Sequence, residues 1–252
     1  ALLSGVQIMP VPGERGAFTA AQVSELIRPE NVHHPQTRLI CLENTHNRTG
    51  GSIFPLDSIK EIYDLSREKN IAIHLDGARL WNASVATGIS IAEYCRYSDS
   101  VSMCFSKGLG APVGSVIAGS REFIERARYY RKVYGGGMRQ SGILAAAAIY
   151  AVENHIERLA EDHRRARKLA EFIAELPGIA IDPETVQTNI VVFDLTGSGW
   201  TGEQFINALF ENGVKMLTFA GTRIRAVTHL HITDEDISRT ESIIRKVWNG
   251  RK

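Results

Sequence analysis

The sequence has few of the features that would set a chain apart from ordinary globular proteins. Its three cysteines, Cys41, Cys95 and Cys104, are odd in number, far apart and in apolar contexts. They predict reduced core residues in a cytoplasmic protein, and neither a disulfide framework nor a metal site. No apolar run approaches the ~18 residues that a membrane-spanning helix requires. A formal net charge of +1 gives no electrostatic reason to expect binding to nucleic acid or to an anionic membrane.

Two phosphate-binding motifs are also absent. No G-x-x-x-x-G-K-[ST] sequence occurs, which excludes the simplest nucleoside triphosphate site. The glycines from Gly108 to Gly114 lack the spacing of a dinucleotide-binding loop and are interrupted by Pro112. The chain opens at Ala1 without a signal-peptide pattern, and residues 2–9 have the character of the middle of a fold. We therefore expect residues upstream of Ala1 in the parent protein.

The first part of the chain alternates short apolar runs with segments of helical periodicity. The expected strands are 6–9, 39–42, 71–75, 100–105 and 113–118, and the expected helices are 19–27, 56–68, 83–94 with a break at Gly88, and 123–133. This alternation predicts βαβ units, and hence an α/β fold with a mainly parallel sheet flanked by helices. At 252 residues, 44% of them hydrophobic, the chain is long enough for one large domain or for a large and a small one.

The second part of the chain is more charged. Residues 141–169 have the pattern of one long helix, and a strand at 189–195, a helix at 202–211, a strand at 224–227 and a helix at 234–248 follow. These elements predict a small α+β domain. We therefore expect a large domain over residues 1–153 and a small domain over residues 154–252, joined by the long helix.

Two residues at expected strand ends carry the strongest chemical signal. Asp76 follows one strand, and Lys107 follows the next and precedes small residues that let a planar ring approach. Parallel strands end at the same edge of a sheet, so the two side chains should meet there. A lysine that forms a Schiff base and a carboxylate that keeps a pyridine nitrogen protonated are what pyridoxal phosphate needs. Taken alone, Lys107 could be merely solvated, and Asp76 could cap a helix or pair with Arg79.

Three further polar residues are candidates for the same edge. His46 could stack on a ring or exchange a proton with a hydroxyl group near neutral pH, although most histidines are surface residues. Arg79 could bind an anionic group of a cofactor or substrate, because a guanidinium group suits a carboxylate. Arg225 is a charge within an apolar strand. It is either a solvent-facing residue of an edge strand or a clamp for an α-carboxylate.

Five segments, taken in order, resemble the threonine aldolases, which are fold-type I pyridoxal-phosphate enzymes of the β-eliminating lyase group. The segments are 43–47, 74–79, 106–115, 135–140 and 225–229. The resemblance runs from the first residue to the C-terminus. It implies that Lys107 is the Schiff-base lysine, that Asp76 is the partner of the pyridine nitrogen, and that His46 contacts the substrate hydroxyl group.

The same resemblance assigns roles to five more residues. It implies that Arg79 and Arg225 serve the substrate carboxylate or the cofactor, and that Ser106 contributes to the cofactor site. Family enzymes are homotetramers built from close dimers. The resemblance therefore implies that Lys132 and Arg139 reach the cofactor phosphate of a neighbouring subunit.

The expected activity is retro-aldol cleavage of a β-hydroxy-α-amino acid, such as threonine or allo-threonine, to glycine and an aldehyde. Another fold-type I reaction (β-elimination, racemisation or transamination) and a catalytically silent subunit remain alternatives. One departure from the family concerns its phosphate-binding Ser-Gly-Thr loop and a ring-stacking histidine. The family places both N-terminal to anything in this sequence, so the site built from residues 1–252 is expected to be incomplete.

Overall fold

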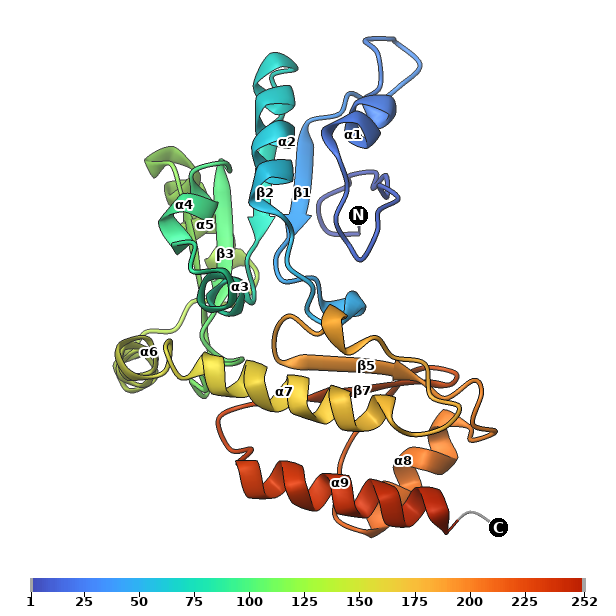
Figure 1. Ribbon diagram of the computed structural model, residues 1–252. Coiled ribbons are helices and arrows are strands. Elements are labelled where there is room, and N and C mark those ends of the chain that lie inside the picture. Colours follow the sequence, from blue (N-terminus) through green and yellow to red (C-terminus); the bar gives the residue numbers. More distant parts are fainter. Residues whose placement is uncertain (1, 251–252) are drawn as a thin grey trace.

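The computed structural model describes residues 2–250 as two sheets, each with its own hydrophobic core (Figure 1). The larger sheet has the order β1-β2-β3-β4 and consists of β1 (Leu39–Glu43), β2 (Ala72–Asp76), β3 (Ser100–Cys104) and β4 (Ser115–Gly119). The first three strands are parallel, and β4 runs antiparallel to β3. The prediction of a mainly parallel sheet flanked by helices is confirmed.

The helices around this sheet follow from local sequence signals. They are α1 (Ala20–Leu26), α2 (Leu56–Glu68), α3 (Leu80–Thr87), α4 (Ile91–Cys95) and α5 (Arg121–Val133), with a 3₁₀ turn η1 (Asn47–Thr49). Thr19 begins α1 through a capping box with Gln22. Helix α2 buries Ile59 and Ile62, one turn apart, against the sheet. Gly88 ends α3 in the left-handed conformation, with φ of 73°.

The smaller sheet is entirely antiparallel and has the order β5-β7-β6. Its elements are η2 (Pro183–Thr185), β5 (Ile190–Asp194), α8 (Gly202–Glu211), β6 (Leu217–Ala220), β7 (Arg223–Val227) and α9 (Asp234–Asn249). Phe205 of α8 is the centre of an edge-to-face aromatic cluster with Phe193, Trp200 and Trp248. The expected α+β arrangement is therefore present, with one strand, β6, that the sequence did not reveal.

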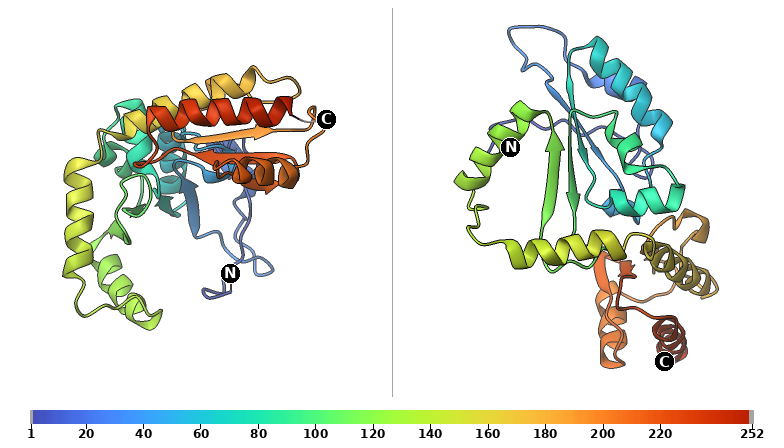
Figure 2. Two further views of the ribbon diagram at one scale, coloured as in Figure 1. Left: turned by 90° about the horizontal axis from the view of Figure 1, so that it is seen from below. Right: turned by 90° about the vertical axis from the view of Figure 1, so that its left-hand side faces the viewer.

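The prediction of one helix over residues 141–169 is wrong. The structure has two helices, α6 (Gly142–Asn154) and α7 (Leu159–Ala174), and they run in different directions (Figure 1). The turn between them is fixed by tertiary contacts: the His155 ring bonds to the carbonyl oxygen of Leu109 at 2.6 Å, and Leu159 is fully buried. Helix α7 then packs on α3, β5 and α9, whereas α5 and α6 project to one side of the two sheets (Figure 2).

The expected strand at 6–9 is also wrong. This segment has no regular structure, and Val6 and Ile8 are exposed. The backbone of this segment pairs with no strand in the described part of the chain. The boundary between a large and a small domain after residue 153 stays a prediction. No helix within residues 2–250 is long and apolar enough to cross a membrane.

Candidate active site

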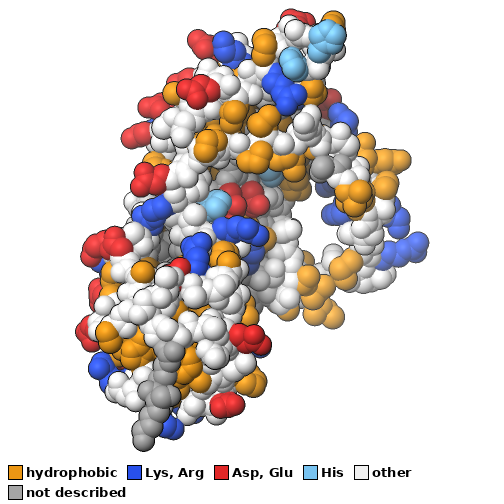
Figure 3. Space-filling view, turned by 90° about the vertical axis from the view of Figure 1, so that its right-hand side faces the viewer, with side chains coloured by type: hydrophobic (Ala, Val, Ile, Leu, Met, Phe, Trp, Pro, Cys, Tyr) orange, Lys and Arg blue, Asp and Glu red, His pale blue; other side chains and the backbone are white. Residues whose placement is uncertain are grey.

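The carboxyl ends of β1, β2 and β3 bring polar side chains to one edge of the larger sheet. The register pairs Glu43 with Asp76, and Asp76 with Ser102. A hydrogen bond from the Gly77 amide to the Ser102 carbonyl, at 2.8 Å, ties the end of β2 to β3. Figure 3 shows acidic, basic and histidine side chains gathered in a hollow between the upper and lower halves of the molecule.

Asp76 is exposed at this edge and is only partly engaged. One oxygen, Oδ1, accepts a hydrogen bond from the Ala78 amide at 3.1 Å. Asp76 does not cap α3, whose N-cap is Arg79 and has no side-chain cap bond. No ion pair joins Asp76 to Arg79 within the described residues. Both structural alternatives for Asp76 are therefore absent, and its second oxygen is free to bind a ligand.

Lys107 lies three residues after β3 and beside Ser106, and both residues are exposed. Its side chain makes no hydrogen bond or ion pair with residues 2–250. Its backbone is held, because the Lys107 carbonyl accepts a bond from the Gly110 amide at 2.9 Å. Gly108 is buried, and a Cβ atom there would lie 2.8 Å from Leu159 Cδ2. The backbone of Lys107 is thus held in place, whereas its side-chain amine has no bonding partner among residues 2–250.

His46 follows β1 on a loop that backbone bonds to Ser52 hold in place. Its Nδ1 is hydrogen-bonded to Thr49 Oγ1 at 3.0 Å, and its Nε2 lies 3.6 Å from Glu43 Oε2. Gly16 packs directly on the imidazole ring, where a Cβ atom would collide. The ring is therefore half-buried and oriented, which is what proton transfer to a bound molecule requires.

The two candidate arginines approach the site from different elements, Arg79 from the start of α3 and Arg225 from β7. Burial lowers the pKa of Arg79, and the positive charge of Arg225 lowers it further, while Glu43 and Asp76 act in the opposite direction. Burial also lowers the pKa of Arg225. The Arg225 side chain donates to Asn47 Oδ1 at 3.1 Å, and its buried Nε has no acceptor. Neither guanidinium group has a carboxylate partner within residues 2–250, so the pair is suited to an anionic ligand.

The structure does not bring two of the expected residues into this group. Lys132 lies in α5, and Arg139 lies in the connection to α6. Both are exposed and make no side-chain hydrogen bond or ion pair in the described part of the chain. They belong to the projecting arm formed by α5 and α6 (Figure 2). Their predicted contact with a neighbouring subunit stays a prediction.

The sequence did not identify two residues that contact the site residues, Glu43 and Asn47. Glu43 accepts a hydrogen bond from the Asn47 amide at 2.9 Å and lies beside His46. Asn47 in turn holds Arg225, which is 178 positions away in the sequence. A polar residue directly at the end of β1 was the available signal for Glu43. Nothing local connects Asn47 with Arg225.

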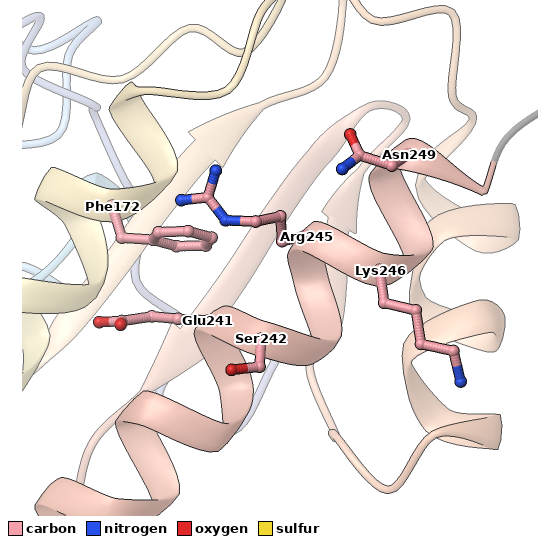
Figure 4. Close-up of a pocket in the computed structure, with 6 residues that line it drawn as sticks. All are labelled: Phe172, Glu241, Ser242, Arg245, Lys246 and Asn249. Atoms are coloured by element: carbon pink, nitrogen blue, oxygen red, sulfur yellow. The ribbon is translucent and has the colours of Figure 1, made fainter.

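Two pockets lie outside this polar group. One of about 430 Å³ lies between α7 and α9 (Figure 4) and is lined by Phe172, Glu241, Ser242, Arg245, Lys246 and Asn249. Arg245 lies over the Phe172 ring there, 5.1 Å from its centroid. A second pocket, of about 500 Å³, is mostly apolar and runs from Phe105 along α6. No group of three or more potential metal ligands occurs among residues 2–250.

Comparison with known proteins identifies the family. The model of the beta-eliminating lyases matches residues 1–196. Low-specificity L-threonine aldolase 1 of Arabidopsis thaliana is 42% identical, over 97% of this chain and 69% of that protein. The low specificity L-threonine aldolase of Escherichia coli K12 is 41% identical, over 94% of this chain and 69% of that protein. The chain thus spans about 70% of the length of these relatives.

Solved structures agree on the fold. A putative L-allo-threonine aldolase of Listeria monocytogenes has a TM-score of 0.73 at 22% identity, covering 91% of this chain and 65% of the other. The threonine aldolase of Leishmania major has a TM-score of 0.79 at 18% identity, covering 97% and 71%. The architecture is that of the fold-type I pyridoxal-phosphate enzymes. The chain belongs to the beta-eliminating lyase family and, within it, to the threonine aldolases.

Proposed function

We propose that the protein cleaves β-hydroxy-α-amino acids such as threonine and allo-threonine to glycine and an aldehyde, with pyridoxal phosphate as its cofactor. The names of the relatives support the reaction. One structural observation supports a carboxylate-bearing substrate. Arg79, at the start of α3, and Arg225, in β7, lie close enough for their charges to interact, and neither has an acidic ion-pair partner in the described residues.

The residues present fit the ring of the cofactor. Lys107 offers an unengaged amine for the aldehyde carbon, and Asp76 has a free oxygen that can hold the proton of the ring nitrogen. Both stand at the ends of adjacent parallel strands, where ligands of open α/β sheets bind. Bound there, pyridoxal phosphate would supply an acceptor for the electron pair of the broken Cα–Cβ bond.

The remaining residues would orient the substrate and move its proton. Arg79 and Arg225 bind the α-carboxylate, and the bond from Arg225 to Asn47 keeps that guanidinium group at the end of β1. Holding the carboxylate in this way would determine which bond of Cα is broken. His46 takes the proton of the β-hydroxyl group as the Cα–Cβ bond breaks. Cα must take up a proton in place of the broken bond to give glycine, and with the cofactor bound the Lys107 amine would be the group that releases this product.

The first experiment maps the lysine. Incubation of the intact protein with pyridoxal phosphate, reduction with borohydride and peptide mass mapping should place the pyridoxyl group on Lys107. Lys107→Ala should abolish the modification, whereas Lys69→Ala, at an exposed lysine after α2, should leave it unchanged. Modification scattered over surface lysines would refute the assignment.

A product assay then separates the reactions. Glycine and acetaldehyde from threonine are expected, whereas 2-oxobutyrate with ammonia would indicate β-elimination. Cofactor binding without turnover would favour a catalytically silent subunit. We also propose a homotetramer in which Lys132 and Arg139 serve a neighbouring subunit, and a cytoplasmic location. Sedimentation of the wild type and of Arg139→Ala, with cofactor affinity measured in parallel, tests the assembly.

A further inference from the structure

The backbone that carries Lys107 rests on a buried polar pair that the site described above does not include. Gly108 faces Leu159 and Asn82, and a Cβ atom on Gly108 would lie 3.3 Å from Asn82 Oδ1. Asn82 is only 2% exposed. Its Nδ2 donates a hydrogen bond to Nε2 of His163 at 3.0 Å. The lysine backbone, α3 and α7 therefore meet at Asn82.

The direction of this hydrogen bond is determined by the chemistry of the two groups. The Asn82 amide nitrogen is a donor only, so His163 Nε2 must accept and the imidazole must be neutral. Burial lowers the pKa of His163 to about 4, against the opposing charge of Asp162. The bond from His163 fixes the Asn82 amide, whose Oδ1 and Nδ2 would lie 3.3 and 3.6 Å from a Cβ atom on Gly108. A leucine could fill the same space but could not set that orientation.

Helix α7 contacts the other side of the site through the residue before His163. The Asp162 carbonyl accepts a hydrogen bond from Thr228 Oγ1 at 2.7 Å, three residues after Arg225. The Asp162 side chain is fully buried and bound by both terminal nitrogens of Arg158, at 3.1 and 2.7 Å. One turn of α7 thus touches the end of β7, α3 and the Lys107 backbone together.

We propose that Asn82 and His163 are positioning residues for Lys107. Their hydrogen bond fixes the buried amide against which Gly108 packs, and so fixes where the lysine amine lies relative to Asp76. This inference rests on the proposed role of Lys107. Neither residue touches the cofactor or the substrate. Their effect passes through the backbone of residues 107–108.

The test compares three variants of α7. His163→Leu removes the acceptor, and His163→Gln restores one through its side-chain oxygen. Lys168→Ala alters a partly exposed residue of the same helix that contacts Ser238 and Glu241 of α9. The readout is the rate at which pyridoxyl-Lys107 accumulates under borohydride, together with kcat and KM. Because a displacement of a reacting group by about 1 Å costs roughly 100-fold, we expect His163→Leu to lower the modification rate and kcat at least about tenfold.

The pattern across the variants distinguishes positioning from simple packing. We expect KM to stay within about twofold in His163→Leu, since the arginines are untouched, and His163→Gln to recover to within about threefold of the wild type. Lys168→Ala should match the wild type. Equal rates in His163→Leu and the wild type, or no recovery by glutamine, would overturn the proposal. If pyridoxal phosphate and borohydride do not modify Lys107 in the wild type, the proposed function itself would be overturned.

A second pair keeps the test decisive if His163→Leu does not fold. Gly108→Ala places a methyl group against Leu159 and Asn82 from the other side, and it should lower the modification rate in the same way. Gly142→Ala is the matched control, because a Cβ atom there meets no atom within 4 Å. If the Gly108→Ala protein is modified as fast as the Gly142→Ala protein, the packing of Gly108 on Asn82 and Leu159 does not position the lysine.

Discussion

Arg79, the N-cap residue of α3, and Arg225, in β7 of the smaller sheet, lie close enough for the charge of Arg225 to lower the pKa of Arg79. Two partly buried positive charges in proximity are unfavourable unless an anion lies between them. Both groups stay protonated at neutral pH because an arginine is effectively always charged. The fold therefore holds the two guanidinium groups where they can bind an anionic ligand.

The hydrogen bond from Arg225 to Asn47 should matter for substrate affinity. Asn47→Ala removes the acceptor at 3.1 Å and lets the guanidinium group move, so we expect KM to rise about tenfold with kcat changed less than about threefold. Steady-state kinetics with threonine measures both constants. The control is Arg48→Ala, at the exposed neighbouring position. An unchanged KM in Asn47→Ala would show that Asn47 does not orient Arg225.

Asp76 should affect turnover and not folding. Asp76→Asn removes the negative charge that would hold the proton on the ring nitrogen, and we expect kcat to fall at least about 100-fold. The residue is exposed and makes one hydrogen bond, to the Ala78 amide. The melting temperature of the apoprotein should therefore stay close to that of Asp57→Asn, a change at another exposed carboxylate. Near-normal turnover in Asp76→Asn would disprove this role.

Two phenylalanines of α8 offer a matched test of the smaller core. Phe205 is fully buried in the aromatic cluster, whereas Phe210 is 67% exposed. Phe205→Ala should lower the free energy of unfolding by about 3–5 kcal/mol, through lost burial and the cavity left behind. Phe210→Ala should change it by less than about 1 kcal/mol. Urea unfolding followed by tryptophan fluorescence measures both, and similar values would contradict the packing described.

Asp99 should make stability depend on pH. The side chain of Arg67 donates to both carboxylate oxygens, and the Ile73 amide donates to Oδ2, which together hold the pKa of Asp99 below its usual value of 3.8. A lowered pKa stabilises the folded state above about pH 4, and this contribution disappears as the pH falls towards the folded-state pKa.

Asp99→Asn measures that contribution directly. Because the carboxylate is 41% exposed, we expect a loss of only about 1 kcal/mol at pH 7, and a smaller difference from the wild type at pH 3. Asp64→Asn, at an exposed position of α2, is the control. If Asp99→Asn lowers the free energy of unfolding by the same amount at both pH values, the lowered pKa of Asp99 is not the source of its contribution to stability.

Local patterns were sufficient wherever a short segment determines its own structure. The prediction of a helix over 56–68 matches α2 in both bounds, because its apolar positions recur at helical spacing on one face. The helix starting after Thr19 was predictable for a similar reason, since its cap is made within four residues. The strand ends at Asp76 and before Lys107 follow from the same alternation of strand and helix.

Long-range contacts account for the errors. Helical periodicity continues through residues 155–158, and only the bond from His155 to the Leu109 carbonyl shows where the chain turns. Apolar residues at 6–9 have the pattern of a strand, but a strand requires a neighbour to pair with. The partnership of Arg225 with Asn47 joins two sheets. No pattern within a short stretch of sequence encodes such a contact.

The two arginines are each anchored in a separate hydrophobic core: Arg79 precedes the buried Leu80, and Arg225 lies between the buried Ile224 and Ala226. The distance between their guanidinium groups therefore depends on how the two cores lie relative to one another. A small rotation of one sheet would change the length of acid that both arginines can grip, while Asp76 stays in place. The packing between the two cores, together with the arginines themselves, would then determine which acids the protein accepts.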